Sequence, residues 1–308
     1  MPTLKEIKGR IGSVRSTLKI TSAMKLVSSA KLRKAQNAIA AMRPYEEELR
    51  RMLEMASGAG GVTETVTSPS KTANFAGDVP EKVTSPAVII AVASNSSLCG
   101  GFNANVIAKV RAVRRSGDVV YSIGRKMADA MARDGFSSPS DYSTLSEHPA
   151  YAEAAALVEK LSEDFYDGRI SGVTLVYTHF VSTSRQVPVV EPLLPVDETP
   201  DRVGGDGAAV PDVSTAVMPG SDRASDAILE PSARELLEAL LPRTLKLKLY
   251  AALLDSAAAE HAARTIAMQT ATDNAEDLLS ELTLQYNKGR QQKITSEILD
   301  LAGGQAAE

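Results

Sequence analysis

The residues of this chain that could carry chemistry are few and widely spaced. Its histidines are His148, His179 and His261, and none lies at metal-ligand spacing from another histidine or from the single cysteine, Cys99. Structural and catalytic metal sites need such clusters, and covalent catalysis needs a nucleophile with a base beside it. We therefore expect ordinary structural or surface histidines, with no metal, no cofactor and no catalytic residue.

One segment has the position of a phosphate-binding turn. Residues 98–103 (LCGGFN) follow an apolar stretch and open a helical one, which is where α/β proteins hold phosphate groups. The segment lacks the GxGxxG and P-loop spacings. We favour glycines that let the turn pack closely, and a nucleotide-binding α/β enzyme remains the alternative.

Charge is unevenly distributed along the chain. The net charge is −4, yet residues 1–56 hold twelve Lys/Arg and five Glu, whereas residues 197–235 hold nine Asp/Glu and three Arg. A basic arm on an acidic protein indicates an anionic partner. An acidic protein and a nucleic acid both fit, although no aromatic residue is interleaved with the basic residues of 25–34, which makes base stacking a poor expectation.

The basic arm has the periodicity of a long helix. From Leu4 to Leu53 apolar residues recur at alternating steps of three and four, and eleven of fifteen positions in this register are apolar, which is typical of a coiled coil. Thr3 and Glu6 predict a capping box at its start. Pro44 predicts a kink or boundary, and the glycines of 58–61 predict the end.

Three polar residues interrupt this seam in the middle. They are Thr21, Lys25 and Ser28. The interruption is either a local register lock between paired helices or a face that meets something other than the partner helix.

The C-terminal part of the chain predicts a second long helix, starting near Ser232 and continuing towards Leu301. Pro242 interrupts it early, and the glycines at 303–304 predict its end. Arg290 and Gln291 are directional hydrogen-bonding groups on an otherwise plain stretch, and a solvated face would explain them equally well. A lone helix of this length is unstable in water, so the two terminal helices should pair antiparallel.

Between these helices, strand and helix patterns alternate, which predicts a small Rossmann-like α/β domain. The fold class is thus α/β plus coiled coil. Residues 184–196 should be extended and broken by prolines. Strands are expected at 86–93, 119–123 and 172–180, and helices at 103–115, 125–133 and 150–166. The predicted divisions are a shaft helix at 1–57, a loop at 58–84, the α/β domain at 85–196, an acidic flexible insertion at 197–230, a second shaft helix at 231–302 and a tail at 303–308.

The N-terminal MPTLKEIKGR has no apolar signal core, and no run approaches a membrane span. One cysteine allows no disulfide within the chain, which fits a reducing compartment. We therefore expect a cytoplasmic protein that reaches a membrane only through a partner.

Several segments resemble the gamma subunit of the rotary F-type ATP synthase. The matches, in chain order, are IKGRIGSVRSTLKITSAMKLVSSAKLRKAQ, LCGGFNAN, SRQVP, EHAART, ATDN, YNKGRQ and ITSEI. Where that family usually has a charged triplet before LCGG, this chain has Asn95, Ser96 and Ser97.

The resemblance implies a non-catalytic rotor shaft. It would turn inside a ring of alpha and beta subunits, with its α/β domain against the epsilon subunit and the c-ring, at the cytoplasmic face of the cell membrane. Proton flow would turn the c-ring, and ATP would be made on the beta subunits. No nucleic acid would be bound.

The resemblance also implies contact residues. Arg290, Gln291 and Thr295 match positions that hydrogen-bond a beta subunit, and Met24 and Arg264 match positions near its acidic loops. Lys25 is included because its charge beside Met24 suits the same loops. The predicted rotor–stator contacts are Met24, Lys25, Arg264, Arg290, Gln291 and Thr295.

Overall fold

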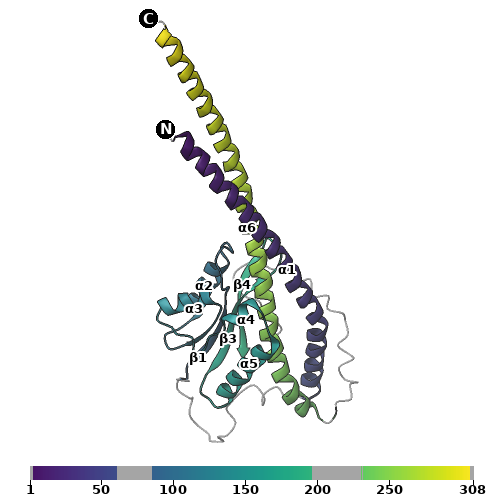
Figure 1. Ribbon diagram of the computed structural model, residues 1–308. Coiled ribbons are helices and arrows are strands. Elements are labelled where there is room, and N and C mark those ends of the chain that lie inside the picture. Colours follow the sequence, from purple (N-terminus) through teal and green to yellow (C-terminus); the bar gives the residue numbers. More distant parts are fainter. Residues whose placement is uncertain (1–2, 61–84, 196–229, 231, 306–308) are drawn as a thin grey trace.

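The computed structural model describes residues 3–60, 85–195, 230 and 232–305 (Figure 1). Most of the predicted loop at 58–84, almost all of the acidic insertion at 197–230 and the last three residues lie outside this part of the chain. Among the helices that are described, none is both long and apolar enough to cross a membrane.

Two long helices form an antiparallel pair, as the sequence predicts. They are α1 (Leu4–Gly60, 57 residues) and α6 (Ala233–Gln305, 73 residues). At about 1.5 Å per residue they reach roughly 85 and 110 Å. In Figure 1 both termini lie at the same end of the molecule, and α6 continues past the start of α1.

The predicted seam of α1 is the surface that faces α6. Leu32 and Ala35 are buried against Ala258 and Ala262, and further down α1 Leu49 packs on leucines from the start of α6. Residue numbers at the contacts therefore increase along α1 while they decrease along α6, as an antiparallel pair requires. The small alanines at the middle of this interface let the two backbones approach closely, so the pairing supplies the stability that neither helix has alone.

The helix boundaries confirm some predictions and correct others. The backbone N–H of Thr3 donates to Glu6 Oε2 (3.0 Å) and that of Glu6 to Thr3 Oγ1 (3.3 Å), which is the predicted capping box. Neither Pro44 nor Pro242 ends its helix. Both prolines are exposed, and the pairing of α1 with α6 outweighs one lost backbone bond. The glycines at 303–304 do not stop α6 either, because glycine permits a helix end without requiring one.

The α/β domain is built on one mixed sheet of order β2-β1-β3-β4. The parallel strands β1, β2 and β3 agree closely with the predicted ranges, whereas the segment expected to be merely extended is the antiparallel edge strand β4. Prolines fit there because an edge strand needs backbone donors on one side only. The strands are β1 (Ala87–Val92), β2 (Val119–Ile123), β3 (Gly172–Phe180) and β4 (Gln186–Leu194).

Helices cover both faces of this sheet. On one face lie α2 (Phe102–Val113) and α3 (Arg125–Arg133), and on the other lie α5 (Tyr151–Tyr166) and the lower half of α6. A short helix that the sequence did not predict, α4 (Ser143–Glu147), is tied to the end of β1 because Ser146 Oγ donates to the carbonyl of Ala93 at 2.6 Å.

Helix α6 belongs to the shaft and to the α/β domain at once. Leu245, Leu249 and Leu253 are buried in the same core as β1, β3 and α5, while the neighbouring Leu240 and Leu247 pack against α1. In Figure 1, α6 runs between α1 and the sheet. The domain is therefore attached to the shaft mainly along α6, and Phe180 of β3 also packs on the cluster that α1 and α6 share.

Candidate functional site

The polar break in the α1 seam faces α6 and not the outside. Thr21 and Ser28 are buried. Thr272 of α6 donates to Thr21 Oγ1 at 3.0 Å, and Thr21 in turn donates to the carbonyl of Leu18. Thr272 Oγ1 also lies 2.8 Å from the carbonyl of Met268 on its own helix. A shift would lose the bond between the helices and leave each hydroxyl with its own helix only, so the bond favours one alignment. The register-lock interpretation is favoured, and a partner face at Thr21 and Ser28 is wrong.

The outward side of the same α1 segment carries an apolar surface that sequence reasoning missed. Ile20, Leu26 and Val27 are 60, 70 and 58% exposed, and Ala23 and Ala30 are exposed beside them. We call these five residues the α1 patch. The available signal was their register: they fall outside the seam, so α6 cannot cover them. Clustered exposed apolar residues mark an interaction surface.

The part of α1 around the α1 patch is strongly basic. From Thr3 to Arg43 the helix has ten Lys/Arg and one acidic residue. None of these basic side chains forms an ion pair with another residue in the described ranges. Met24 and Lys25, two of the predicted contact residues, are half-buried next to the patch. This side of the shaft therefore suits a partner with an apolar centre and acidic surroundings.

Arg264, the third predicted contact residue, is engaged inside the chain. It is 7% exposed. Its Nη1 donates to Glu260 Oε1 at 2.6 Å, and its Nη2 donates to Ser96 Oγ at 2.8 Å and to the carbonyl of Ser97 at 3.4 Å. Burial raises the pKa of Glu260, and the Arg264 charge and hydrogen bond act against that rise. A contact of Arg264 with a partner stays a prediction.

The turn after β1 is packed against α6. Asn103 Nδ2 donates to Ser94 Oγ at 2.8 Å and to Cys99 Sγ at 3.1 Å, which holds the turn together. Cys99 and Phe102 are buried in one cluster with Ala259 of α6. The place in which an α/β enzyme would hold phosphate is thus filled by the chain's own helix, which favours the packing interpretation of LCGGFN over nucleotide binding.

Beyond the start of α1, no other described element of the chain packs against α6. Leu4 lies close to Gly289, with 3.2 Å between its Cδ2 and an ideal Cβ on the glycine. After this point Arg290, Gln291 and Thr295 are all exposed, as are Ile294 and other apolar residues.

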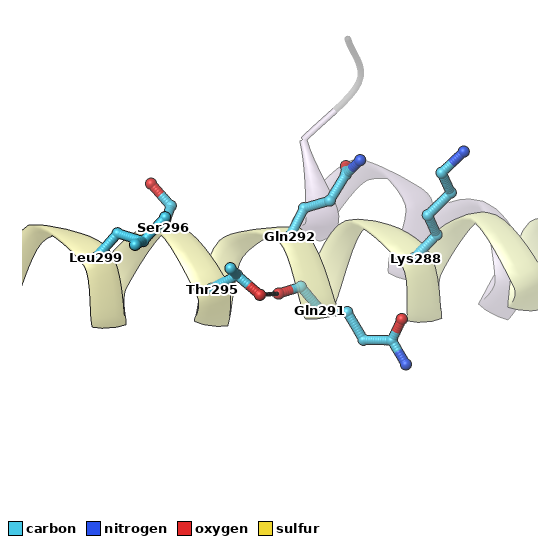
Figure 2. Close-up of a pocket in the computed structure, with 6 residues that line it drawn as sticks. All are labelled: Lys288, Gln291, Gln292, Thr295, Ser296 and Leu299. Carbon is cyan, nitrogen blue, oxygen red and sulfur yellow. Dashed lines mark hydrogen bonds between the residues drawn. The ribbon is translucent and has the colours of Figure 1, made fainter.

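Figure 2 shows a shallow pocket on this free end of α6. Thr295 Oγ1 donates to the carbonyl of Gln291 at 2.9 Å, so its own hydrogen is used within the helix. The Gln291 amide extends outward from the backbone in this view and has no partner drawn. The pocket is lined by Lys288, Gln291, Gln292, Thr295, Ser296 and Leu299.

The three histidines have different surroundings. His148 is exposed. His179 Nδ1 lies 2.5 Å from Asp255 Oδ2, and this hydrogen bond raises the pKa of His179 against the opposing effect of burial. Burial lowers the pKa of His261 to about 4, with the charge of Arg264 acting in the same direction. Across the described ranges no group of three or more His, Cys, Asp or Glu side chains could hold a metal ion.

His261 should make the fold sensitive to acid. Between its ordinary pKa of 6.5 and about 4, the unfolded chain takes up a proton at His261 and the folded chain does not. Stability that is present above pH 6.5 is therefore lost as the pH falls towards 4. We expect H261Q to lose less stability over this window than wild type, by roughly 1–3 kcal/mol after allowance for partial exposure. Urea unfolding followed by circular dichroism at several pH values measures this.

The control for that experiment is H148Q, which removes an exposed histidine. Parallel curves for wild type and H261Q across this window would contradict the role given to His261.

The fold and these surfaces define a class of protein: a stalk made of two antiparallel helices, with an α/β domain attached to one of them. A family model described as ATP synthase matches residues 3–307. The chain is 43% identical to the ATP synthase gamma chains of Phocaeicola vulgatus, with 100% of both chains covered, and of Bacteroides thetaiotaomicron, with 99% of both covered. It belongs to the ATP synthase gamma chain family.

The fold agrees with that of a solved structure. The rotor of the Euglena gracilis mitochondrial ATP synthase contains a chain that matches with a TM-score of 0.61 and 18% identity, over 94% of this chain and 98% of that one. The predicted fold class, coiled coil plus Rossmann-like domain, is confirmed.

Proposed function

We propose that this chain is the central rotor shaft of an ATP synthase and has no active site of its own. It couples proton-driven rotation of a c-ring to ATP synthesis on beta subunits. The names and titles of its relatives support the stalk role. The observation that carries the proposal is the asymmetry of the shaft: α1 exposes the α1 patch among basic residues, whereas residues 266–287 of α6 hold four acidic residues and no basic one.

Asymmetry is what a rotor needs to act on identical neighbours. A shaft that contacts one beta conformation better than another shifts the population of that subunit, and turning the shaft passes the preference to the next subunit. A hydrogen bond to a charged group contributes roughly 1.5–3 kcal/mol. Contacts of that size bias a stopping angle and still break on every turn.

We assign the partners accordingly. The α1 patch, Met24, Lys25 and the free end of α6 face the alpha and beta subunits, and the α/β domain faces the epsilon subunit and the c-ring. Because the charged shaft suits an acidic protein surface, no nucleic acid is needed to explain it. The complex holds this chain at the cytoplasmic face of the cell membrane as a peripheral subunit.

The test is reconstitution. The purified chain should have no ATPase activity alone and should confer activity when mixed with alpha and beta subunits, and it should co-purify as one copy for three of each. Stoichiometric ATP binding by the isolated chain in titration calorimetry, or retention on DNA with a steep salt dependence, would contradict the proposal.

Removing two side chains at the free end of α6 should slow turnover without preventing assembly. R290A combined with Q291A deletes two exposed side chains, so the described part of the chain should fold as before. We expect ATP turnover of the reconstituted complex to fall severalfold, because one or two hydrogen bonds of about 1.5–3 kcal/mol are lost from the rotor–stator contact. Steady-state phosphate release measures turnover, and size-exclusion chromatography measures assembly.

The matched control is R234A, whose side chain pairs with exposed Glu238 at the opposite end of the same helix. Unchanged turnover in the double variant would remove Arg290 and Gln291 from the contact surface.

A further inference from the structure

The strand order of the sheet creates a crevice that α6 fills. The chain passes from β1 to β2 on one side and then returns past β1 to β3 on the other, so the order reverses between β1 and β3. In doubly wound sheets the carboxyl ends of the strands at this point form the ligand-binding crevice. Here Ala259 of α6 is fully buried there against Cys99 and Phe102, with Phe180 packed beside them.

Two sets of polar contacts tie α6 to this crevice. At the end of β3, Asp255 accepts a bond from the backbone N–H of Phe180 at 3.1 Å with one oxygen and contacts His179 with the other. After β1, Arg264 donates to Ser96 and Ser97 while it pairs with Glu260. We call Asp255, Glu260 and Arg264 the α6 clamp.

The α6 clamp fixes the rotation and position of α6 relative to the sheet, which apolar packing alone does not fix. Hydrophobic contacts are non-directional, so they hold a helix against a sheet but permit small rotations and shifts of it. The clamp residues span nine positions, roughly 14 Å or two and a half turns, and bind the ends of the two central strands. A rotation of α6 about its axis would break both sets of contacts together. The ion pair is shielded from competing water, since its side chains are only 9 and 10% exposed.

We propose that the α6 clamp prevents slip between the shaft and the α/β domain, so that torque passes from the domain to the shaft. The inference rests on the proposed rotor function and deepens it. Asp255, Glu260 and Arg264 are positioning residues in this role: they hold α6 at a fixed angle relative to the domain that the c-ring would turn. Without the clamp, torque would pass through the apolar face around Leu249 and Leu253 and through two lysine contacts nearer the start of α6. These are Lys246 with Glu159 of α5 and Lys248 with the carbonyl of Pro192 in β4.

The test uses the whole ATP synthase in membrane vesicles and the variant D255A, which removes both Asp255 contacts. ATP hydrolysis is followed by phosphate release, and proton pumping by a pH-sensitive dye. Losing a hydrogen bond to a charged group should shift the equilibrium between the clamped and a rotated position of α6 by roughly tenfold or more, towards the rotated position. We expect hydrolysis by the soluble complex with alpha and beta subunits to be retained and protons pumped per ATP to fall about twofold or more.

The variant D255N gives a graded comparison, because its amide oxygen still accepts from Phe180 and its charge is gone. It should fall between D255A and wild type. The matched control D273A removes an exposed aspartate of the same helix, which accepts a hydrogen bond from Gln269 at 2.6 Å, and it should pump as wild type does.

An unchanged ratio of protons to ATP in D255A overturns the clamp, as does an equal fall in hydrolysis and pumping. If D255A fails to assemble, the ratio in D255N decides by the same criteria. Failure of the proposed function itself is recognised separately, since wild-type chain would then confer no activity on alpha and beta subunits.

Discussion

Replacing Arg264 by methionine should lower the free energy of unfolding by about 3–5 kcal/mol, because removing one partner leaves a buried charge uncompensated. The partner is Glu260, whose carboxylate lies 2.6 Å from the guanidinium with almost no access to water. Methionine keeps much of the apolar length of arginine, so the fall in the free energy of unfolding measures the loss of the charge and not the creation of a cavity. Ser96 also loses a donor, which adds to the effect.

Urea unfolding at neutral pH measures this change, and two further variants give it meaning. R234M is the control, since Arg234 pairs with Glu238 at four-residue spacing on the same helix but is exposed, and such pairs contribute at most about 1 kcal/mol. The double variant R264M/E260Q should recover part of the loss because no charge stays buried. Equal losses for R264M and R234M would show that burial gives the Glu260–Arg264 pair no special weight.

The long helices could be predicted because their pairing repeats. Every three or four residues α1 meets α6 again, so the apolar residues from Leu4 to Leu53 give the same information many times. A single deviation such as Pro44 does not change the result, since the contacts on both sides outweigh it. The capping box of Thr3 and Glu6 was equally readable, because both partners lie within one turn.

What could not be predicted depends on contacts between distant segments. Arg264 looks in the sequence like a charge available to a partner, and only the fold places it between Glu260 and the turn after β1. The edge strand β4 carries two prolines, which hide its pairing with β3 from any local pattern. That α6 fills the crevice at β1 and β3 follows from strand order, which no local signal in the sequence specifies.

The predicted contact residues show the same division. Arg290, Gln291 and Thr295 are exposed on the free end of α6, where a partner can reach them. Thr21 looked like part of a partner face and turned out to bond Thr272 within the shaft. The difference is whether the residue lies where the two helices are paired. Within the paired part, a polar residue in the seam lies against the other helix, whereas beyond the start of α1 no other described helix faces α6.

One consequence is that the two sides of the α1 segment from Ile20 to Ala30 have different roles. Its inner side favours one alignment with α6 through the bond between Thr21 and Thr272, and Ser28 is buried in the same interface. Its outer side is the α1 patch, with lysines and arginines around it. A partner that presses on the patch therefore acts on a segment whose alignment is already locked, so the force is passed to α6 and not absorbed by sliding of α1.

The double variant I20E/V27E should abolish most of the ATPase activity that the chain confers on alpha and beta subunits. The two side chains are 60 and 58% exposed and lie one above the other at seven-residue spacing. Glutamate suits an exposed helix position, so the shaft itself should fold as before. At the interface each carboxylate would lose its water, and each would repel an acidic partner. A desolvated or like-charged group costs a few kcal/mol, so activity should fall more than about tenfold.

The control is Y166E, which places one such glutamate at a side chain as exposed as Val27, 58%, on α5 of the α/β domain. Circular dichroism and thermal unfolding should show both proteins folded like wild type, and phosphate release with alpha and beta subunits should separate them. A fall in I20E/V27E that high salt relieves would assign the repulsive part to charge, because salt screens exposed charges and leaves apolar contact intact. Full activity in I20E/V27E would mean that no stator surface presses on the α1 patch, and the asymmetry of the shaft would have to reside in α6 alone.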